Sequence, residues 1–264
     1  MDLQLKGLKA LVTGSSAGIG YAIAELLCKE GAIVYLNGRT QARVDQAVKK
    51  LQAAVPTGKV HGLVSDLASA EGANKLISEL PDADILINNV GIYEPKEFAQ
   101  ITDEMWLNTF QVNVMSGIRL SRHYIEGMRK RDWGRIVFIS SESGVNIPSE
   151  MIHYGVTKTA QIAVARGLAE TTAGTKITVN SVLPGPTASE GVEQFIVEMS
   201  KQNKTDVQTV ENEFFKEVRP SSLLKRFATS EEVANMVAYV CSPLAAATNG
   251  AALRVDGGVV RSIL

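Results

Sequence analysis

The chain has 264 residues, of which 45% are hydrophobic and 21% charged, and its 27 basic and 28 acidic side chains leave a net charge of −1. This composition is typical of a globular protein with a large core, and the balanced charge argues against nucleic acid as a partner. No run approaches the roughly 18 apolar residues of a membrane span, and the first residues lack the apolar core of a signal peptide. We therefore expect a soluble, cytoplasmic protein with no membrane partner.

Short runs rich in β-branched residues alternate along the chain with stretches of helical period. The seven runs are 9–14, 32–37, 59–66, 83–91, 135–141, 176–185 and 252–258. Strands separated by helices predict crossover connections and a parallel sheet, and nearly continuous apolar strands predict a sheet covered on both faces. The apolar stripe at Ile19, Ile23 and Leu26 predicts a first helix that ends near Gly31, and Thr102 is a good start for a later one. The predicted fold is α/β, with a doubly wound seven-stranded parallel sheet.

One segment interrupts the alternation of strands and helices. Residues 188–225 are polar and helix-prone, and they fit no strand–helix unit. An insertion of this kind is typical of a lid or binding segment, with a solvated surface excursion as the alternative. Phe195, Phe214 and Phe215 within it would form either an apolar wall for a substrate or ordinary packing. No linker, composition shift or repeat divides the chain, so we predict a single domain over 1–264 with a helical substrate-binding lid at 188–225.

The sequence TGSSAGIG, residues 13–20, lies between the first predicted strand and the first predicted helix. Glycines in such a turn let the backbone approach a ligand closely, and free N–H groups at the start of a helix favour an anionic pyrophosphate. A glycine motif alone is weak evidence, and a tight turn without a ligand is the alternative. Its position between a strand and a helix is the context that dinucleotide binding requires.

The end of the second predicted strand distinguishes two dinucleotides. An acidic side chain at this position binds the ribose of NAD, whereas a nearby arginine accepts the 2′-phosphate of NADP. The sequence has Asn37 and Gly38 in place of the acid, followed by Arg39. Because a guanidinium can hold a phosphate bidentately, NADP(H) is the preferred cofactor. NAD(H) stays open, since a single arginine after a strand is often just part of the surface.

Tyr154 and Lys158 stand four positions apart in a stretch with the character of an apolar helix, so they share one face. A phenol is a poor acid or base at neutral pH, but a nearby ammonium would bring its pKa toward the working range. This spacing alone is common in packed helices. Taken by itself, the pair is compatible with simple packing.

Other short stretches accompany this pair. They are TGSSAGIG at 13–20, SDL at 65–67, NNVG at 88–91, Asn113 in FQVNVMS, RIVFISSESG at 135–144, YGVTK at 154–158, NSVLPG at 180–185 and VDGG at 255–258. In this order and spacing, and over essentially its full length, the chain resembles the classical short-chain dehydrogenase/reductase family. The resemblance implies a Rossmann-type fold and reversible hydride transfer between a nicotinamide and a carbonyl or secondary-alcohol carbon. The chain departs from the family pattern at Val90, Ser189 and Ala228, where alanine, threonine and glycine are usual.

The resemblance also implies a catalytic set of four residues. Tyr154 would donate a proton in reduction and accept it in oxidation, and Lys158 would hold the ribose hydroxyls and lower the pKa of the tyrosine. The family's spacing selects Ser141, rather than Ser140, to hydrogen-bond the substrate oxygen. Asn113 would position a water that leads from Lys158 to solvent.

The family's cofactor positions fall on residues that follow the predicted strands. They are Gly14, Ser16, Gly18 and Ile19 around the pyrophosphate and ribose, Asp66 and Leu67 beside the adenine, Asn89 and Gly91 with Tyr154 and Lys158 along the ribose, and Pro184, Gly185 and Thr187 at the nicotinamide. Ligands of open α/β sheets bind at these strand ends. Asp66 has a second interpretation, as a carboxylate that caps a helix. No metal is expected, because the three histidines lack paired ligand spacing.

The substrate is left open beyond a small-molecule carbonyl or alcohol. Residues 142–147, Tyr93, Met151 and the predicted lid are expected to face it. A 3-oxoacyl-carrier-protein reductase would need a basic docking patch, for which residues 129–131 are the candidate, although they are equally a solvated helix end. A non-catalytic dinucleotide-binding or sensing protein on the same fold is the alternative to an enzyme. The resemblance further implies a homo-oligomer, a tetramer, built by helices at 102–130 and 152–173 and by the C-terminal segment.

Overall fold

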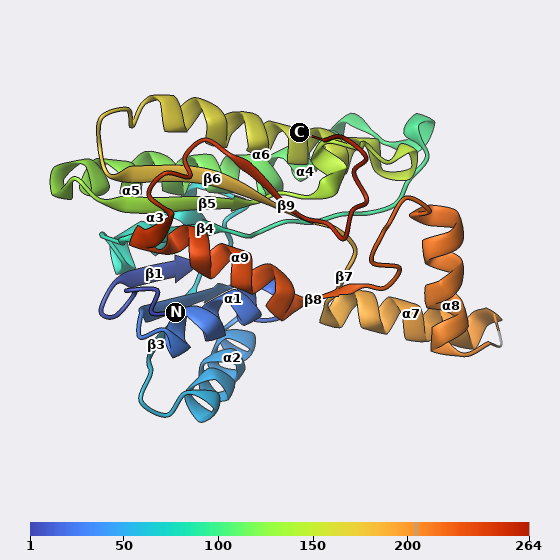
Figure 1. Cartoon of the computed structure of the whole chain (residues 1–264), viewed down its shortest axis with the longest axis horizontal. Coiled ribbons are helices and arrows are strands. Elements are labelled where there is room, and N and C mark those ends of the chain that lie inside the picture. The colour runs from blue at the N-terminus through green and yellow to red at the C-terminus, as the bar shows by residue number, and fades with distance from the viewer. Residues whose placement is uncertain (204, 264) are drawn as a thin grey trace.

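A parallel seven-stranded sheet forms the centre of the computed structural model, which describes residues 1–203 and 205–263 without the side chains of residues 193–195 and 203. The strand order is β3-β2-β1-β4-β5-β6-β9 (Figure 1). The strands are β1 (Lys9–Val12), β2 (Ile33–Gly38), β3 (Lys59–Val64), β4 (Ile85–Asn88), β5 (Gly134–Ile139), β6 (Ile177–Pro184) and β9 (Ala252–Val255). Each overlaps one of the seven predicted runs, and only Gly38 and Gly134 fall outside them, so the predicted fold is confirmed.

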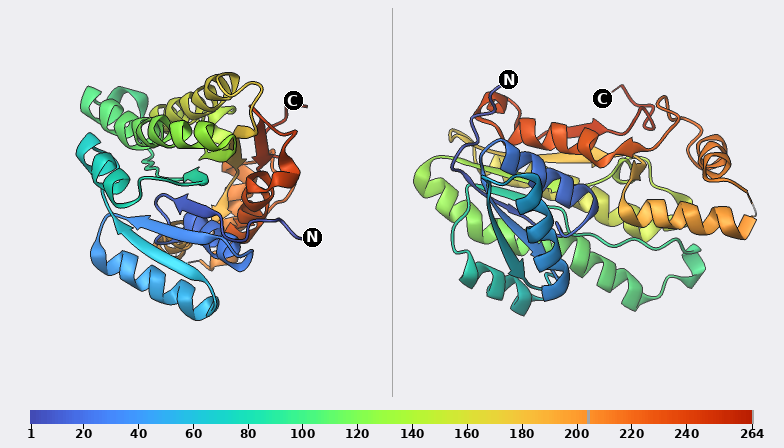
Figure 2. Two further views of the ribbon diagram at one scale, coloured as in Figure 1. Left: turned by 90° about the vertical axis from the view of Figure 1, so that its left-hand side faces the viewer. Right: turned by 90° about the horizontal axis from the view of Figure 1, so that it is seen from below.

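Helices cover both faces of the sheet (Figure 2). On one face α1 (Gly18–Lys29), α2 (Gln41–Ala54) and α9 (Ser230–Cys241) contribute to one apolar core. On the other face α3 (Ala70–Glu79), α5 (Ser116–Arg131) and α6 (Ile152–Glu170) contribute to a second core. Every residue of β4, β5 and β6 is buried, as expected for strands that are covered on both sides. β1 pairs with both β2 and β4. The chain first adds β2 and β3 on one side of β1 and then adds the remaining strands on its other side, beginning with β4.

The long helical stretch that begins after Thr102 is not regular. The Thr102 side chain caps α4 (Asp103–Phe110) by accepting a hydrogen bond from the backbone N–H of Met105, as its position predicted. A π-helical turn (Gln111–Met115) then separates α4 from α5. Such turns widen a helix locally and often occur at functional sites. The predicted helix is therefore three consecutive helical segments, and Asn113 lies in the middle one.

The segment 188–225 lies apart from the sheet. It contains α7 (Glu190–Asn203), α8 (Val207–Glu213) and a π-helical turn (Phe214–Val218), which project from one end of the molecule (Figure 1). Two-residue strands that the sequence did not reveal, β7 (Thr187–Ala188) and β8 (Ala228–Thr229), pair where the segment leaves and rejoins the rest of the chain.

Phe214 and Phe215 of this segment pack against each other and against Phe227. The Phe214 and Phe215 ring centroids each lie 5.0 Å from that of Phe227, and Phe215 is 3% exposed. Phe214 and Phe215 therefore belong to the packing of the segment itself, whereas the Phe195 side chain lies outside the described residues. Across the described part of the chain, no helix is long and apolar enough to cross a membrane.

Candidate active site

The glycine turn follows β1 and begins α1. Gly14 and Gly18 have φ angles of 60° and 57°, in the left-handed region that favours glycine. At Gly20 a Cβ would lie 2.5 Å from the Asn89 amide nitrogen, so a side chain is excluded there. The N-cap residue of α1, Ala17, makes no side-chain hydrogen bond, and the first N–H groups of the helix are left available to an anion. The turn fits a pyrophosphate.

The end of β2 lies beside this turn. The Asn37 side chain is buried and accepts a hydrogen bond from the Gly14 N–H at 3.3 Å, so it holds the turn in place. A Cβ at Gly38 would lie 3.6 Å from the Ser16 hydroxyl. Arg39 follows on the surface and makes no ion pair within the described residues. The Arg39 guanidinium and the nearby Ser16 hydroxyl could both bind a phosphate group, and β2 ends without a carboxylate that would repel it.

The predicted adenine and ribose positions follow β3 and β4. Asp66 accepts a hydrogen bond from the Ala68 N–H at 3.0 Å, while the N-cap of α3 is Ser69, so Asp66 does not cap that helix. Leu67 is buried beneath it. The Asn89 side chain donates to the Gly14 carbonyl at 3.0 Å and so fastens the glycine turn to β4.

The remaining cofactor positions also lie where strands end. A Cβ at Gly91 would lie 3.4 Å from the Lys158 ammonium nitrogen, so this glycine leaves space beside that group. After β6, the Thr187 hydroxyl donates to the Gly185 carbonyl at 2.9 Å. Pro184 ends β6 itself, and Ile19 lies in the first turn of α1. The predicted residues thus come from adjacent strand ends, where β1 and β4 diverge.

The four predicted catalytic residues come from three elements. Ser141 precedes a 3₁₀ turn (Glu142–Gly144) after β5, Tyr154 and Lys158 lie on α6, and Asn113 lies in the π-helical turn. Ser140 donates to the Lys158 carbonyl at 2.8 Å and so points away from Ser141, as the family's spacing predicted.

Lys158 is buried and its ammonium group is held by protein acceptors. Its nitrogen donates to the Ile139 carbonyl at 2.9 Å and to the Gln161 amide oxygen at 3.2 Å, and it lies 5.5 Å from the centroid of the Tyr154 ring. Burial lowers the pKa of Lys158 to about 7. Near neutral pH this lysine therefore both gains and loses a proton, rather than acting as a fixed positive charge.

Tyr154 differs from the expectation drawn from the resemblance. Burial raises the pKa of its phenol, a hydrogen bond with Ser141 lowers it, and the Glu142 carboxylate raises it. Lys158 is not among the groups that shift this pKa. The physical reason is that desolvation favours the neutral form of both the phenol and the amine, so the charge that would stabilise a phenolate is itself weakened. The Tyr93 ring packs edge-on against Tyr154, with centroids 6.0 Å apart.

Asn113 and Gln161 connect the π-helical turn to Lys158. The Asn113 side chain accepts from the Ile92 N–H at 2.7 Å and donates to the Ile92 carbonyl at 2.9 Å. The Gln161 amide donates to the Asn113 carbonyl at 2.5 Å and accepts from Lys158, and only this orientation of the amide satisfies both partners. Gln161 thus links Lys158 to the backbone carbonyl of Asn113. We did not predict it, although its place one turn after Lys158 on the same face was a usable signal.

Comparisons with known proteins show the family of the chain. The family model of the short chain dehydrogenases matches residues 8–199. The chain belongs to the short-chain dehydrogenase family. It is 47% identical to the uncharacterized oxidoreductase YvrD of Bacillus subtilis, over 100% of both chains. It is 33% identical to the 3-oxoacyl-[acyl-carrier-protein] reductase FabG of Aquifex aeolicus, over 98% of this chain and 100% of that protein. Among solved structures, L-sorbose reductase from Gluconobacter frateurii, complexed with NADPH and L-sorbose, matches with a TM-score of 0.93 and 32% identity over 100% of both chains.

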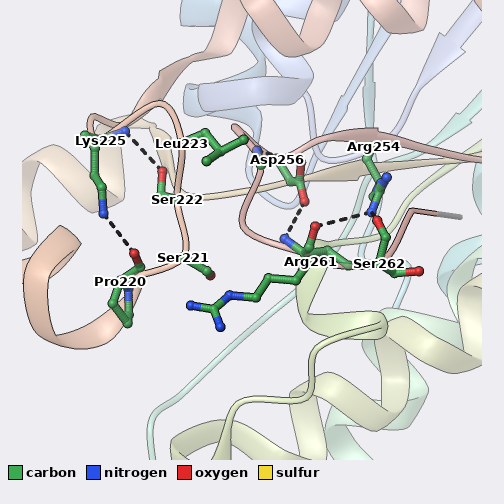
Figure 3. A pocket seen from close by; sticks show the side chains of 11 residues that line it. Pro220, Ser221, Ser222, Leu223, Lys225, Arg254, Asp256, Arg261 and Ser262 are labelled. Carbon is green, nitrogen blue, oxygen red and sulfur yellow. Dashed lines mark hydrogen bonds between the residues drawn. The ribbon is translucent and has the colours of Figure 1, made fainter.

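A cavity of about 710 Å³ in this short-chain dehydrogenase lies between the chain around Ser221 and the chain after β9 (Figure 3). It is lined by the chain around Ser221 and by charged residues of β9 and the segment after it, among them Arg254, Asp256 and Arg261. None of the four predicted catalytic residues lines it. In the described ranges, no group of three His, Cys, Asp or Glu side chains could hold a metal ion.

The basic cluster of this short-chain dehydrogenase, residues 129–131 at the end of α5, is largely neutralised. Arg129 forms an ion pair with Glu126, and Arg131 forms ion pairs with Asp82 and Asp84. A docking surface for an acidic carrier protein needs uncompensated positive charge. The observed pairing therefore favours the interpretation of this cluster as a solvated helix end.

Proposed function

We propose that this oxidoreductase interconverts a small, polar ketone and the corresponding secondary alcohol with NADP(H), and that Asn113, Ser141, Tyr154 and Lys158 form its catalytic set. The observation that carries the proposal is the meeting of Ser141 and Tyr154 beside Lys158 at the strand ends that also carry the glycine turn. A protein that only binds a dinucleotide needs no hydroxyl and phenol at this place. The fold alone would not distinguish the two classes.

The preference for NADP(H) is supported by Arg39 and Ser16 at the end of β2 and by the absence of an acidic residue there. The solved relative with NADPH bound supports the same preference. When bound, the dinucleotide supplies or accepts the hydride. The glycine turn would hold its pyrophosphate, and the space beside Gly91 would admit its ribose next to Lys158.

The chain's own residues would handle the proton and the substrate oxygen. In reduction Tyr154 gives its phenolic proton to the oxygen that becomes the alcohol, and in oxidation it takes that proton back. Ser141 hydrogen-bonds the same oxygen, where negative charge develops. Lys158, with its pKa near 7, would then return a proton to Tyr154 after reduction and accept one from it after oxidation. Asn113 holds the backbone of Ile92, and Gln161 fixes Lys158.

The polarity around Ser141 supports a hydroxylated substrate such as a ketose. Two serines, a buried glutamate and an arginine lie at this point. The rings of Phe214 and Phe215 pack against Phe227. The relative solved with L-sorbose supports the same class. A 3-oxoacyl thioester is the second candidate, because of the likeness to FabG.

The proposal is tested by following the absorbance of NADPH with a panel of L-sorbose, D-fructose and acetoacetyl-coenzyme A. We expect reduction of a ketose, a slower reaction with NADH, and weak activity on the thioester. Tight NADPH binding without turnover of any carbonyl in this and a wider ketone panel would instead support the sensing protein.

A further inference from the structure

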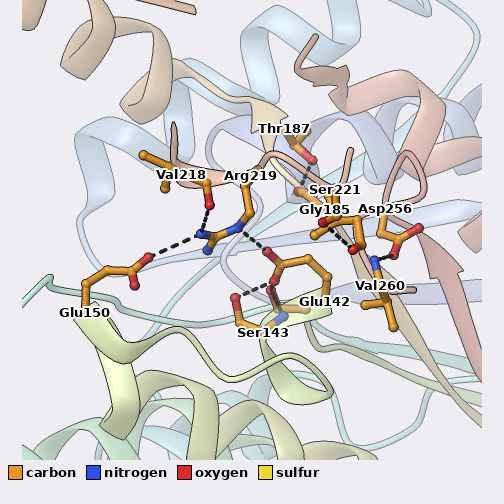
Figure 4. A network of polar contacts seen from close by, with 12 residues as sticks. Glu142, Ser143, Glu150, Gly185, Thr187, Val218, Arg219, Ser221, Asp256 and Val260 are labelled. Carbon is orange, nitrogen blue, oxygen red and sulfur yellow. Dashed lines mark hydrogen bonds and ion pairs between the residues drawn. The ribbon is translucent and has the colours of Figure 1, made fainter. Parts of the chain in front are cut away.

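The carboxylate of Glu142 is buried directly beside Ser141, with 4% of its side chain exposed. One oxygen accepts hydrogen bonds from the Ser141 hydroxyl at 3.0 Å and from the Ser143 hydroxyl, and the other accepts from Arg219 Nε at 2.9 Å (Figure 4). A buried carboxylate is costly without such partners. Glu142 is therefore a fully bonded anion in contact with the predicted substrate-binding serine.

Arg219 reaches this point from the 188–225 segment. It directly follows the π-helical turn Phe214–Val218, and its side chain is 11% exposed. Besides Glu142, its guanidinium binds Glu150 at 3.2 Å and the Val218 carbonyl at 3.0 Å (Figure 4). One side chain thus ties the segment both to the turn that carries Ser141 and to the 3₁₀ turn before α6. No other described residue of 188–225 forms an ion pair with Glu142.

The hydrogen bonds of Ser141 have a direct consequence for its chemistry. The Ser143 N–H donates to the Ser141 oxygen at 3.1 Å, and the single hydroxyl hydrogen of Ser141 is directed to Glu142. A hydroxyl has only one hydrogen to donate. While this hydrogen is bound to Glu142, Ser141 has none to donate to a substrate oxygen or to Tyr154, whose pKa a hydrogen bond from Ser141 lowers. For Ser141 to polarise a carbonyl, that hydrogen must turn away from Glu142.

Arg219 controls how strongly Glu142 holds that hydrogen. An ionised carboxylate is a strong acceptor, and a guanidinium bound to it takes up part of its charge. Because Ser143 also donates to Glu142, the carboxylate stays bonded when the Ser141 hydrogen leaves. We propose that Glu142 is a positioning residue that directs the Ser141 hydroxyl, and that Arg219 releases this hydroxyl to the substrate oxygen. This inference rests on the proposed function of the site.

The same two charges act on Tyr154 with opposite signs. Glu142 and Tyr93 raise the pKa of Tyr154, whereas Arg219 and the hydrogen bond with Ser141 lower it. Lys158 is a further ionisable group near the phenol, and its nitrogen lies 5.5 Å from the ring centroid. Glu142 and Arg219 therefore influence the pKa of Tyr154 as well as the Ser141 hydroxyl. An ion pair with only a structural role would not shift the pH dependence of the reaction.

The test uses Glu142→Gln, Arg219→Gln and the double variant, loaded with NADPH and assayed with the panel carbonyl that the wild type reduces. Matched controls are Glu217→Gln and Lys216→Gln, exposed neighbours on the same segment that pair with each other and do not touch Ser141. We expect Arg219→Gln to lower kcat on the order of tenfold, the loss of one charge-assisted hydrogen bond. In the double variant kcat should recover to about the level of Glu142→Gln alone, because the anion that needed Arg219 is gone.

The pH profile supplies the second readout. Reduction requires a protonated Tyr154, so kcat falls above its apparent pKa. Glu142→Gln should move this fall to lower pH and Arg219→Gln should move it to higher pH, while both controls stay at the wild-type position. Shifts in the same direction, no shift in either variant, or additive losses in the double variant would overturn the proposal.

A substrate-free measurement separates failure of this inference from failure of the proposed function. Hydrogen exchange of the amides of residues 207–218 reports how firmly the segment is fastened. Glu142→Gln and Arg219→Gln should each speed this exchange, and the two controls should not. If the exchange is unchanged in both, the pair does not fasten the segment and the inference fails, whether or not a carbonyl is reduced.

Discussion

The ammonium nitrogen of Lys158 lies 5.5 Å from the centre of the Tyr154 ring, one helical turn further along α6. It is held there by the Ile139 carbonyl and by Gln161. Lys158 is buried and Tyr154 is half-buried, and desolvation favours the neutral form of both. The phenol of Tyr154 therefore stays protonated at neutral pH, and Lys158 has a pKa near neutral pH.

The buried lysine predicts a dependence of stability on pH. The pKa of Lys158 is about 7 in the folded chain, below its ordinary value of 10.5. Between these values the unfolded chain binds a proton that the folded chain does not, so this lysine makes stability rise with pH across that window. Lys158→Met removes this contribution. We expect the melting temperature of the wild type, relative to the variant, to increase from pH 7 to pH 10 in thermal unfolding. A difference that stays constant with pH would show that Lys158 titrates normally.

The cofactor assignment predicts an asymmetric effect at the end of β2. Arg39→Ala should weaken NADPH binding about 10- to 100-fold, the loss of a bidentate bond to a phosphate, and leave NADH binding nearly unchanged. Dissociation constants from quenching of protein fluorescence would measure both. The exposed Lys49 on α2 offers a matched control, because its removal changes the charge equally at a distance from the turn. Equal losses for the two dinucleotides would refute the assignment.

The Asn113 side chain predicts a stability effect in addition to any catalytic one. Its amide holds both backbone groups of Ile92 and donates to the Thr157 hydroxyl at 3.0 Å. Asn113→Ala leaves these groups unpaired in a buried setting, so the free energy of unfolding should fall by about 2 kcal/mol or more. Chemical denaturation measures this change. The exposed Gln208 on α8 provides the control, since Gln208→Ala should have little effect. An Asn113→Ala protein as stable as the control would show that the hydrogen bonds of Asn113 to Ile92 and Thr157 do not stabilise the fold.

The sequence was sufficient for the scaffold, because strand periodicity and the glycine turn are local signals. Most of the predicted site residues lie at the strand ends and on α6, and the roles of all of them stay predictions. It could not reveal the role of Arg219, which meets Glu142 across 77 positions of chain. Nor did it indicate the π-helical turn around Asn113, which packs against α6. The pKa of Tyr154 was predicted in the wrong direction, because its burial could not be read from the spacing of Tyr154 and Lys158.

The tetramer that the resemblance implies stays a prediction. Apolar side chains are exposed on the helices expected to build it, with Leu107 68%, Phe110 39% and Val156 41% exposed. Leu107→Asp and Val156→Asp should each shift the sedimentation of the protein toward smaller species. Val207→Asp on α8 alters an equally exposed apolar residue outside those helices and should leave sedimentation unchanged. A monomeric wild type would remove the prediction.

The central claim is that Tyr154 carries the proton in carbonyl reduction. It is tested most directly by comparing Tyr154→Phe with the wild type in kcat for the NADPH-dependent reduction of the panel ketose, alongside NADPH binding. The account predicts a fall in kcat of about 10²- to 10⁴-fold, the usual contribution of a positioned general acid, with NADPH binding largely retained. A Tyr154→Phe protein that reduces the ketose as fast as the wild type would contradict it.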